Sequence, residues 1–184
     1  LQYMAFAMAP AALAVHDEGL FELDGNAVSE GGVAGEDWDH VFAGTDAADS
    51  TVFLTDKVNS LTDDIFTGGS SKDINDTSAW LWTKSKPQAK NDITHAFAAA
   101  YTATSAESAG DTIVYFGQDR YAQSGDAFVG FWFFKGAVGE KAGGTFNGAH
   151  QVGDILVQVN FTNGGAIQDF DISSWNGSGL TAIA

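Results

Sequence analysis

Short apolar stretches separated by turn residues dominate the chain, and most of them alternate apolar with more polar positions. Alternation with a period of two is typical of β-strands, because successive side chains point to opposite faces of a sheet. The pattern predicts strands at 20–26, 51–54, 113–116, 128–134, 155–161 and 166–172. The first ends in an Asp-Gly turn, and 163–165 form the turn between the last two. The rest of the polar region 46–87 is predicted to form loops.

The segment 92–101 fits two periods. Its apolar residues recur at helical spacing from Ile93 to Tyr101, and its alanines favour a helix. The same segment also alternates from His95 to Tyr101 as a strand would. We favour a strand, because the 113–116 strand follows after a loop of small residues and would complete a hairpin. A helix stays the alternative.

The segment 128–134 is apolar at every position except Gly130. A strand that is apolar on both faces is predicted to be central and covered on both sides. Strands at near-regular spacing without intervening helices point to an all-β fold, a two-sheet antiparallel β-sandwich. We expect a jelly roll of the concanavalin A-like lectin type.

Length and charge narrow the function classes. The 184 residues are enough for one domain with a full core, which we place at 15–176. A net charge of −16 would repel phosphate backbones, so nucleic acid is not expected as a partner. Because the chain has no cysteine, any metal must use oxygen or imidazole ligands. Carboxylates that cluster could hold calcium.

The two ends suggest export and continuation. Residues 1–14 include a short apolar run that ends in Ala12-Leu13-Ala14, an A-x-A cleavage pattern, and are predicted to be a truncated signal peptide. No other stretch is apolar for long enough to span a bilayer. Residues 177–184 are expected to begin a C-terminal continuation. We expect a secreted or cell-surface protein.

Several sequence blocks strengthen the expectation of export. They are FELDGNA at 21–27, DWD at 37–39, KPQAKNDITHAFAAAYT at 86–102, YFGQDR at 115–120, GDAFVGFWFF at 125–134 and HQVGDILV at 150–157. Together they resemble a family of secreted bacterial proteins, common in actinobacteria, that has no established activity. The resemblance implies export and implies no catalytic or ligand-binding residue.

Two groups of residues are candidates for ligand binding. In an extended chain, Asp37 and Asp39 would share one side with Trp38 between them, an arrangement that suits sugar hydroxyls and a stacked sugar ring. Trp80 and Trp82 would likewise share a face and form a stacking platform. The alternative for all three tryptophans is core packing, which is the more frequent environment of this residue.

Asp73, Asn75 and Asp76 place three oxygen-bearing side chains in one loop and are the candidate calcium ligands. Their spacing does not match an EF-hand loop. The alternative is a turn in which these side chains cap their own backbone.

No catalytic apparatus is recognisable. The four histidines form no zinc-binding pair, and Glu22-Leu23-Asp24 supplies only half of the carboxylate strand typical of lectin-like glycosidases. We therefore expect a non-catalytic module that binds an extracellular glycan or a surface protein. Calcium is expected only as a supporting ion. The alternatives are a glycoside hydrolase-like enzyme and a structural spacer.

Overall fold

The structure is a computed structural model, and it describes residues 19–24, 26–31, 35–67, 76–105, 108–162 and 166–183, with the side chain of Gln168 left aside. The fold is all-β with antiparallel sheets, and its only described helices are α1 (Trp38–Ala43) and the short 3-10 helix η1 (Thr77–Ala79). The chain divides into two compact units. Unit 1 comprises 1–55 and 95–118, and unit 2 comprises 56–94 and 119–184. The predicted signal segment 1–14 and the turn 163–165 lie outside the described residues.

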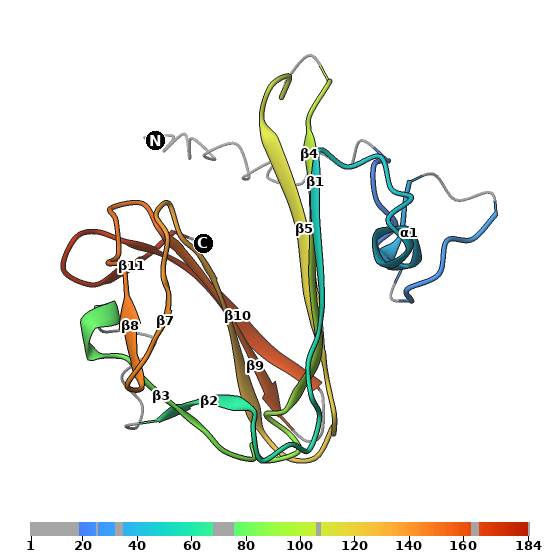
Figure 1. Cartoon of the computed structure of the whole chain (residues 1–184). Coiled ribbons are helices and arrows are strands. Elements are labelled where there is room, and N and C mark those ends of the chain that lie inside the picture. Colours follow the sequence, from blue (N-terminus) through green and yellow to red (C-terminus); the bar gives the residue numbers. More distant parts are fainter. Residues whose placement is uncertain are drawn as a thin grey trace, which may run out of the picture. The chain divides into compact units, whose positions relative to one another are not determined.

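The sheet of unit 1 contains β1 (Ser50–Thr55), β4 (Ile93–Thr102) and β5 (Thr112–Arg120) in the order β1-β4-β5 (Figure 1). The prediction of strands at 51–54, 92–101 and 113–116 is confirmed. All six residues of β1 pair antiparallel with β4, from Ser50 with Ala100 to Thr55 with His95. This pairing overrides the helical preference of the alanines, because a strand between two neighbours satisfies its backbone on both sides.

Helix α1 and the segment around Phe21 complete the core of unit 1. Phe21, Val41, Ala99, Tyr101 and Tyr115 form its buried cluster. The predicted strand at 20–26 is wrong, because the described part of this segment makes only an isolated parallel bridge between Phe21 and Glu36. The bridge requires Gly35, since a Cβ there would lie 2.8 Å from the backbone nitrogen of Phe21.

Unit 2 contains two four-stranded antiparallel sheets (Figure 1). One has the order β2-β3-β8-β7, formed by β2 (Asp64–Thr67), β3 (Leu81–Lys84), β8 (Thr145–Asn147) and β7 (Gly139–Lys141). The other has the order β11-β10-β9-β6, formed by β11 (Leu180–Ala182), β10 (Ala166–Trp175), β9 (Ile155–Thr162) and β6 (Ala127–Phe133). The strands predicted at 128–134, 155–161 and 166–172 are confirmed, whereas the short strands β2, β3, β7, β8 and β11 were missed.

Aromatic rings join the two sheets of unit 2. Trp80, which immediately precedes β3, contacts Trp132 of β6 at a ring-centroid distance of 6.1 Å and Phe146 of β8 at 5.5 Å. Trp175 of β10 and Leu156 of β9 are buried in the same unit. Two sheets held by a shared apolar layer are consistent with a β-sandwich.

Strand β6 is not central. Among the described strands it is the last in the order β11-β10-β9-β6, and Phe128 is 71% exposed. The sequence predicted two sheets with this strand covered on both faces, but the described residues form three sheets. An apolar sequence shows that a strand can be buried, and it does not show which neighbour covers it.

Candidate functional site

The predicted Asp37-Trp38-Asp39 site is the start of a helix and not an extended chain. Asp37 is the N-cap of α1, and its Oδ1 accepts a hydrogen bond of 2.6 Å from the backbone nitrogen of Trp38. The ring of Trp38 contacts Phe21 and Phe97, each at a centroid distance of 4.4 Å. Trp38 therefore packs against the core of unit 1, and the two carboxylates do not flank an exposed ring.

Asp37 is fully buried, with 0% of its surface exposed. Its Oδ2 has no hydrogen-bond partner among the described residues. Burial raises the pKa of Asp37, and the charges of Asp24, Glu22 and Asp39 raise it further, while the hydrogen bond from Trp38 opposes the shift. Asp37 is thus a buried carboxylate to which no described residue brings a compensating positive charge, an arrangement that costs stability.

The carboxylate of Glu36, one residue earlier, is satisfied. It accepts bonds of 2.8 Å from the backbone nitrogen of Ala47 and of 3.0 Å from the hydroxyl of Tyr101. Burial raises the pKa of Tyr101, and the hydrogen bond to Glu36 raises it further, so this hydroxyl stays protonated and donates. Glu36 therefore ties the loop before β1 to β4 and is a structural group.

Trp80 and Trp82 do not form a stacking platform. Trp80 is only 4% exposed and lies in the aromatic core of unit 2. The indole nitrogen of Trp82 donates to the backbone oxygen of Thr145 at 2.8 Å and to that of Lys141 at 3.2 Å. Trp82 therefore fastens β3 to the β7–β8 hairpin, which is a structural use of its one polar atom.

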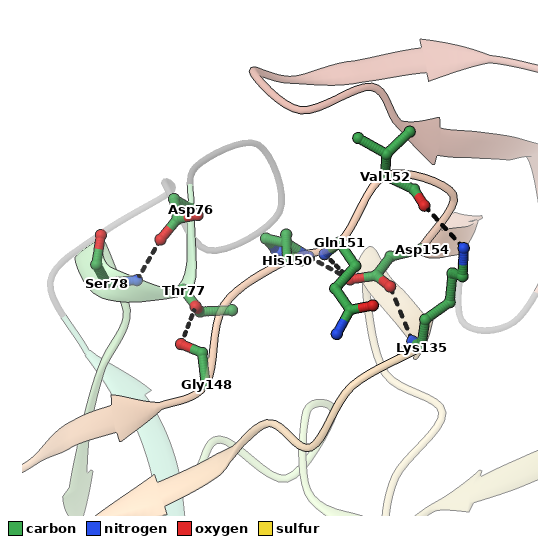
Figure 2. Close-up of polar contacts among 9 residues, drawn as sticks. All are labelled: Asp76, Thr77, Ser78, Lys135, Gly148, His150, Gln151, Val152 and Asp154. Atoms are coloured by element: carbon green, nitrogen blue, oxygen red, sulfur yellow. Dashed lines mark hydrogen bonds and ion pairs between the residues drawn. The ribbon is translucent and has the colours of Figure 1, made fainter.

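Of the three predicted calcium ligands, Asp73 and Asn75 lie outside the described residues. Asp76 is the N-cap of η1, where its Oδ1 accepts a bond of 2.9 Å from the backbone nitrogen of Ser78 (Figure 2). This hydrogen bond lowers the pKa of Asp76. Its described contacts are those of a helix cap. Across the part of the chain that the structure describes, no three His, Asp or Glu side chains are grouped closely enough to hold a metal ion.

Asp154 is the polar centre of unit 2 and was missed by the sequence analysis. It is fully buried, and its Oδ1 accepts from the backbone nitrogen of Lys135 at 2.8 Å. Its Oδ2 accepts from the backbone nitrogen of Gln151 at 2.9 Å and lies 3.1 Å from Nδ1 of His150 (Figure 2). Burial alone would raise the pKa of Asp154, but these contacts together hold it below its usual range.

His150 lies in an aromatic environment. Its ring stacks on Trp175 at 4.5 Å and lies 4.3 Å from the ring of Trp132. Its side chain is fully buried and Nε2 has no hydrogen-bond partner among the described residues. Because His150 and Asp154 are enclosed and have no access to solvent, we assign the pair to the architecture of unit 2. The sequence signal for this pair was two polar residues, His150 and Asp154, placed four residues apart immediately before the apolar strand β9.

One face of the sheet β11-β10-β9-β6 changes character along its length. At one end Trp132, Leu156 and Ser173 lie in register, and Leu156 is fully buried. Towards the other end the same face carries a set of residues that we call the open face: Phe128, Gly130, Gln158, Asn160, Asp169 and Asp171. The register places Phe128, Asn160 and Asp169 side by side on three strands, with Gly130, Gln158 and Asp171 as the next row.

The open face offers an aromatic ring beside polar groups. Phe128, Asp169 and Asp171 are exposed, and Gln158 and Asn160 are half-buried. Gly130 adds no side chain in the row next to Phe128, so one side of the ring is less crowded. The sequence analysis did not identify this surface, because it expected Phe128 to be covered. The sequence signal for this surface was the polar residue at every second position of β9 and β10.

Comparison of the chain with family models, with curated proteins and with solved structures finds no match. Among the described residues, no helix has the length and hydropathy needed to span a bilayer. The function is therefore argued from the residues themselves.

Proposed function

We propose that this chain is a non-catalytic glycan-binding module of a secreted or cell-surface protein, and that the open face is its binding surface. One observation carries the proposal: an exposed aromatic ring lies in register with amide and carboxylate side chains on three adjacent strands. The three strands belong to one sheet, so the spacing of these groups is set by a rigid scaffold.

The chemistry of the open face suits a sugar. One face of a pyranose ring is apolar and packs on an aromatic side chain, while its hydroxyls donate to carboxylates and exchange hydrogen bonds with amides. Gln158 and Asn160 supply both donors and acceptors, and Asp169 and Asp171 supply acceptors. Since the face carries two carboxylates and no cationic side chain, a neutral glycan fits better than a sulfated or uronic one.

The proposal also includes a secreted or cell-surface location and a lectin-type fold. The A-x-A pattern and the resemblance to secreted bacterial proteins support a secreted or surface location. The two packed sheets of unit 2 support a sandwich, of which a lectin-type jelly roll is the form we propose. A surface protein as partner stays the alternative to a glycan.

The test is a glycan array with the full chain, followed by titration calorimetry of any neutral oligosaccharide that binds. Replacement of Phe128 by Ala should weaken binding about tenfold, because the stacking surface is lost. Asn160→Ala should weaken it by a similar factor through lost hydrogen bonds. The matched control is Phe170→Ala, since Phe170 is 61% exposed on the opposite face of the same sheet.

Each outcome separates the alternatives. Equal losses of glycan affinity in the Phe128 and Phe170 variants would show that the glycan does not bind at the open face. Release of shorter sugars from a bound glycan would favour the hydrolase-like enzyme. An array without any ligand would remove the glycan proposal and leave the spacer, or a module that binds a surface protein.

A further inference from the structure

Strand β1 forms an edge of the sheet in unit 1. In the order β1-β4-β5 it has one neighbour among the described strands, and its register with β4 is unbroken over all six residues. The backbone nitrogen of Asp56, which directly follows β1, donates to the backbone oxygen of Thr94 at 2.8 Å. Since the residues that bond to one neighbour alternate along an antiparallel strand, every second residue counted back from Asp56 bonds to β4. The backbone N–H and C=O groups of the others point away from β4: Thr51, Phe53 and Thr55.

These outward backbone groups give the sheet an open edge. No described residue donates a hydrogen bond to them or accepts one from them. Natural proteins usually protect such an edge with a charged side chain, a proline or a short strand, because it otherwise pairs with another chain. Strand β1 spans six residues, and none of them is charged or a proline. The edge of β1 is thus able to accept a further strand.

Apolar side chains lie on both faces of the sheet beside this edge. On one face, the ring of Phe53 contacts Phe42 of α1 at a centroid distance of 5.0 Å, and Phe42 is 68% exposed. On the opposite face, Val52 is 45% exposed and Leu54 is 59% exposed. An added strand would alternate its own side chains between these two apolar surfaces. The central residues of such a strand are therefore expected to be apolar.

The charge of unit 1 indicates the kind of chain that this edge accepts. Half of the 24 acidic residues belong to unit 1 by sequence, yet all 8 Lys and Arg residues belong to unit 2. A second copy of unit 1 would bring the same excess of negative charge to the edge and would be repelled. A cationic segment of a different protein would be attracted.

Acidic residues lie at the end of the sheet where β1 begins. Asp49 directly precedes β1 and is exposed, and its Oδ2 accepts a bond of 2.7 Å from the hydroxyl of Thr102 at the end of β4. Asp111 is exposed and directly precedes β5, and its backbone oxygen accepts from the backbone nitrogen of Ala103 at 2.8 Å. At the opposite end of β1, the acidic residue that follows the strand is itself followed by Lys57. The basic residues of a bound segment therefore belong beside Asp49.

We propose that unit 1 binds an extended, cationic segment of a partner protein, which adds to the three-stranded sheet as a further strand beside β1. The backbone of the segment bonds to the outward groups of Thr51, Phe53 and Thr55. Its central side chains are apolar, and its Lys or Arg residues lie beside Asp49. This surface belongs to unit 1, whereas the open face belongs to unit 2, so the proposal does not depend on glycan binding.

The experiment titrates a dye-labelled synthetic peptide with the full chain and measures fluorescence anisotropy at low salt. The peptide alternates Val and Thr over six residues, the length of β1, and carries Lys residues at both ends. It should bind, and the affinity should fall as salt screens the charges. The same peptide with Glu in place of Lys should not bind. N-methylation of the peptide residues that face β1 should abolish binding, whereas N-methylation of the intervening residues should not, because only the first set bonds to β1.

Two variants of the chain test the edge itself. Leu54→Lys should weaken peptide binding at least about tenfold, because it removes an apolar contact and repels a cationic strand. Its matched control is Leu61→Lys, which should bind as the unchanged chain does, since Leu61 is 76% exposed and lies in unit 2 outside the strands. Thr51→Pro removes one outward N–H group. Because an edge strand tolerates proline where its N–H faces outward, this variant should fold and should bind the peptide less tightly.

Three outcomes overturn the proposal. The first is an absence of peptide binding up to about 1 mM, or equal affinity of the Leu54→Lys and Leu61→Lys variants. The second is binding that does not respond to N-methylation, which would show that the peptide attaches by charge alone. The third comes from sedimentation velocity: a dimer of the unchanged chain that Leu54→Lys dissociates would identify a second copy, and not a partner protein, as the occupant of the edge.

Discussion

Two buried aspartates, one in each unit, have opposite environments. Asp37 and Asp154 are both completely enclosed. Asp154 receives bonds from two backbone nitrogens and lies beside the ring of His150, and its pKa is lowered. Asp37 has one oxygen without a partner among the described residues and several like charges nearby, and its pKa is raised. Burial alone therefore does not give a carboxylate its role; the hydrogen-bond donors around it do.

The contrast extends to the units that hold them. Unit 2 contains every Lys and Arg of the chain, and it also surrounds its central aspartate with backbone donors. Unit 1 contains none, so no Lys or Arg of its own unit pairs with the Asp37 oxygen that lacks a partner among the described residues. A satisfied buried carboxylate stabilises a fold, whereas an unsatisfied one costs stability.

The largest effect is expected for Asp154→Asn. The amide cannot accept at both oxygens, so the backbone nitrogen of Lys135 or that of Gln151 loses its partner. We expect the free energy of unfolding to fall by about 3 kcal/mol, measured by urea denaturation at neutral pH. A loss below about 0.5 kcal/mol would show that these bonds contribute little.

The same pair of proteins gives a pH test. Folding lowers the pKa of Asp154, so its contribution to stability is fully present above the pKa of the unfolded chain and is lost as the pH falls through the lower pKa of the folded state. The difference between the original chain and Asp154→Asn should therefore be constant from neutral pH to about 5 and shrink at lower pH. A difference that grows on acidification would contradict the lowered pKa.

A smaller effect is expected for Tyr101→Phe, which removes the hydroxyl that donates to Glu36. The carboxylate keeps the backbone nitrogen of Ala47, so the stability should fall by only about 1.5 kcal/mol. Urea denaturation measures the change. An unchanged stability would show that the hydrogen bond from Tyr101 to Glu36 contributes nothing to the fold.

The smallest effect, with the opposite sign, is expected for Asp37→Asn. Asparagine still caps α1, and the repulsion from Glu22, Asp24 and Asp39 disappears. The free energy of unfolding should stay unchanged or rise by up to about 1 kcal/mol. A clear loss of stability would show that the buried charge is already compensated and would remove the contrast with Asp154.

Strands could be predicted where the local pattern of apolar and polar residues matches the environment of the strand. The alternation in 155–161 and 166–172 identified β9 and β10, and the apolar run at 128–134 identified β6. Strands β2 and β3 were missed because each has only four residues within a polar region, and because partners distant in the sequence, such as Phe66 with Trp82, form the sheet. The candidate sites could not be predicted in the same way. The sequence suggested that Trp80 forms part of a sugar-stacking platform, but Trp80 is buried in a core.

The sequence by itself determined the all-β class, most strand positions and the uneven charge, because alternation and composition are local properties. Only the tertiary structure decided that Asp154 is satisfied, that Asp37 is not, and that Phe128 is exposed beside Asn160 and Asp169. Each of these depends on which backbone groups and side chains arrive from distant segments. Hydrogen-bond partners and cross-strand neighbours are set by the register of the sheets, which the chain adopts only when it folds.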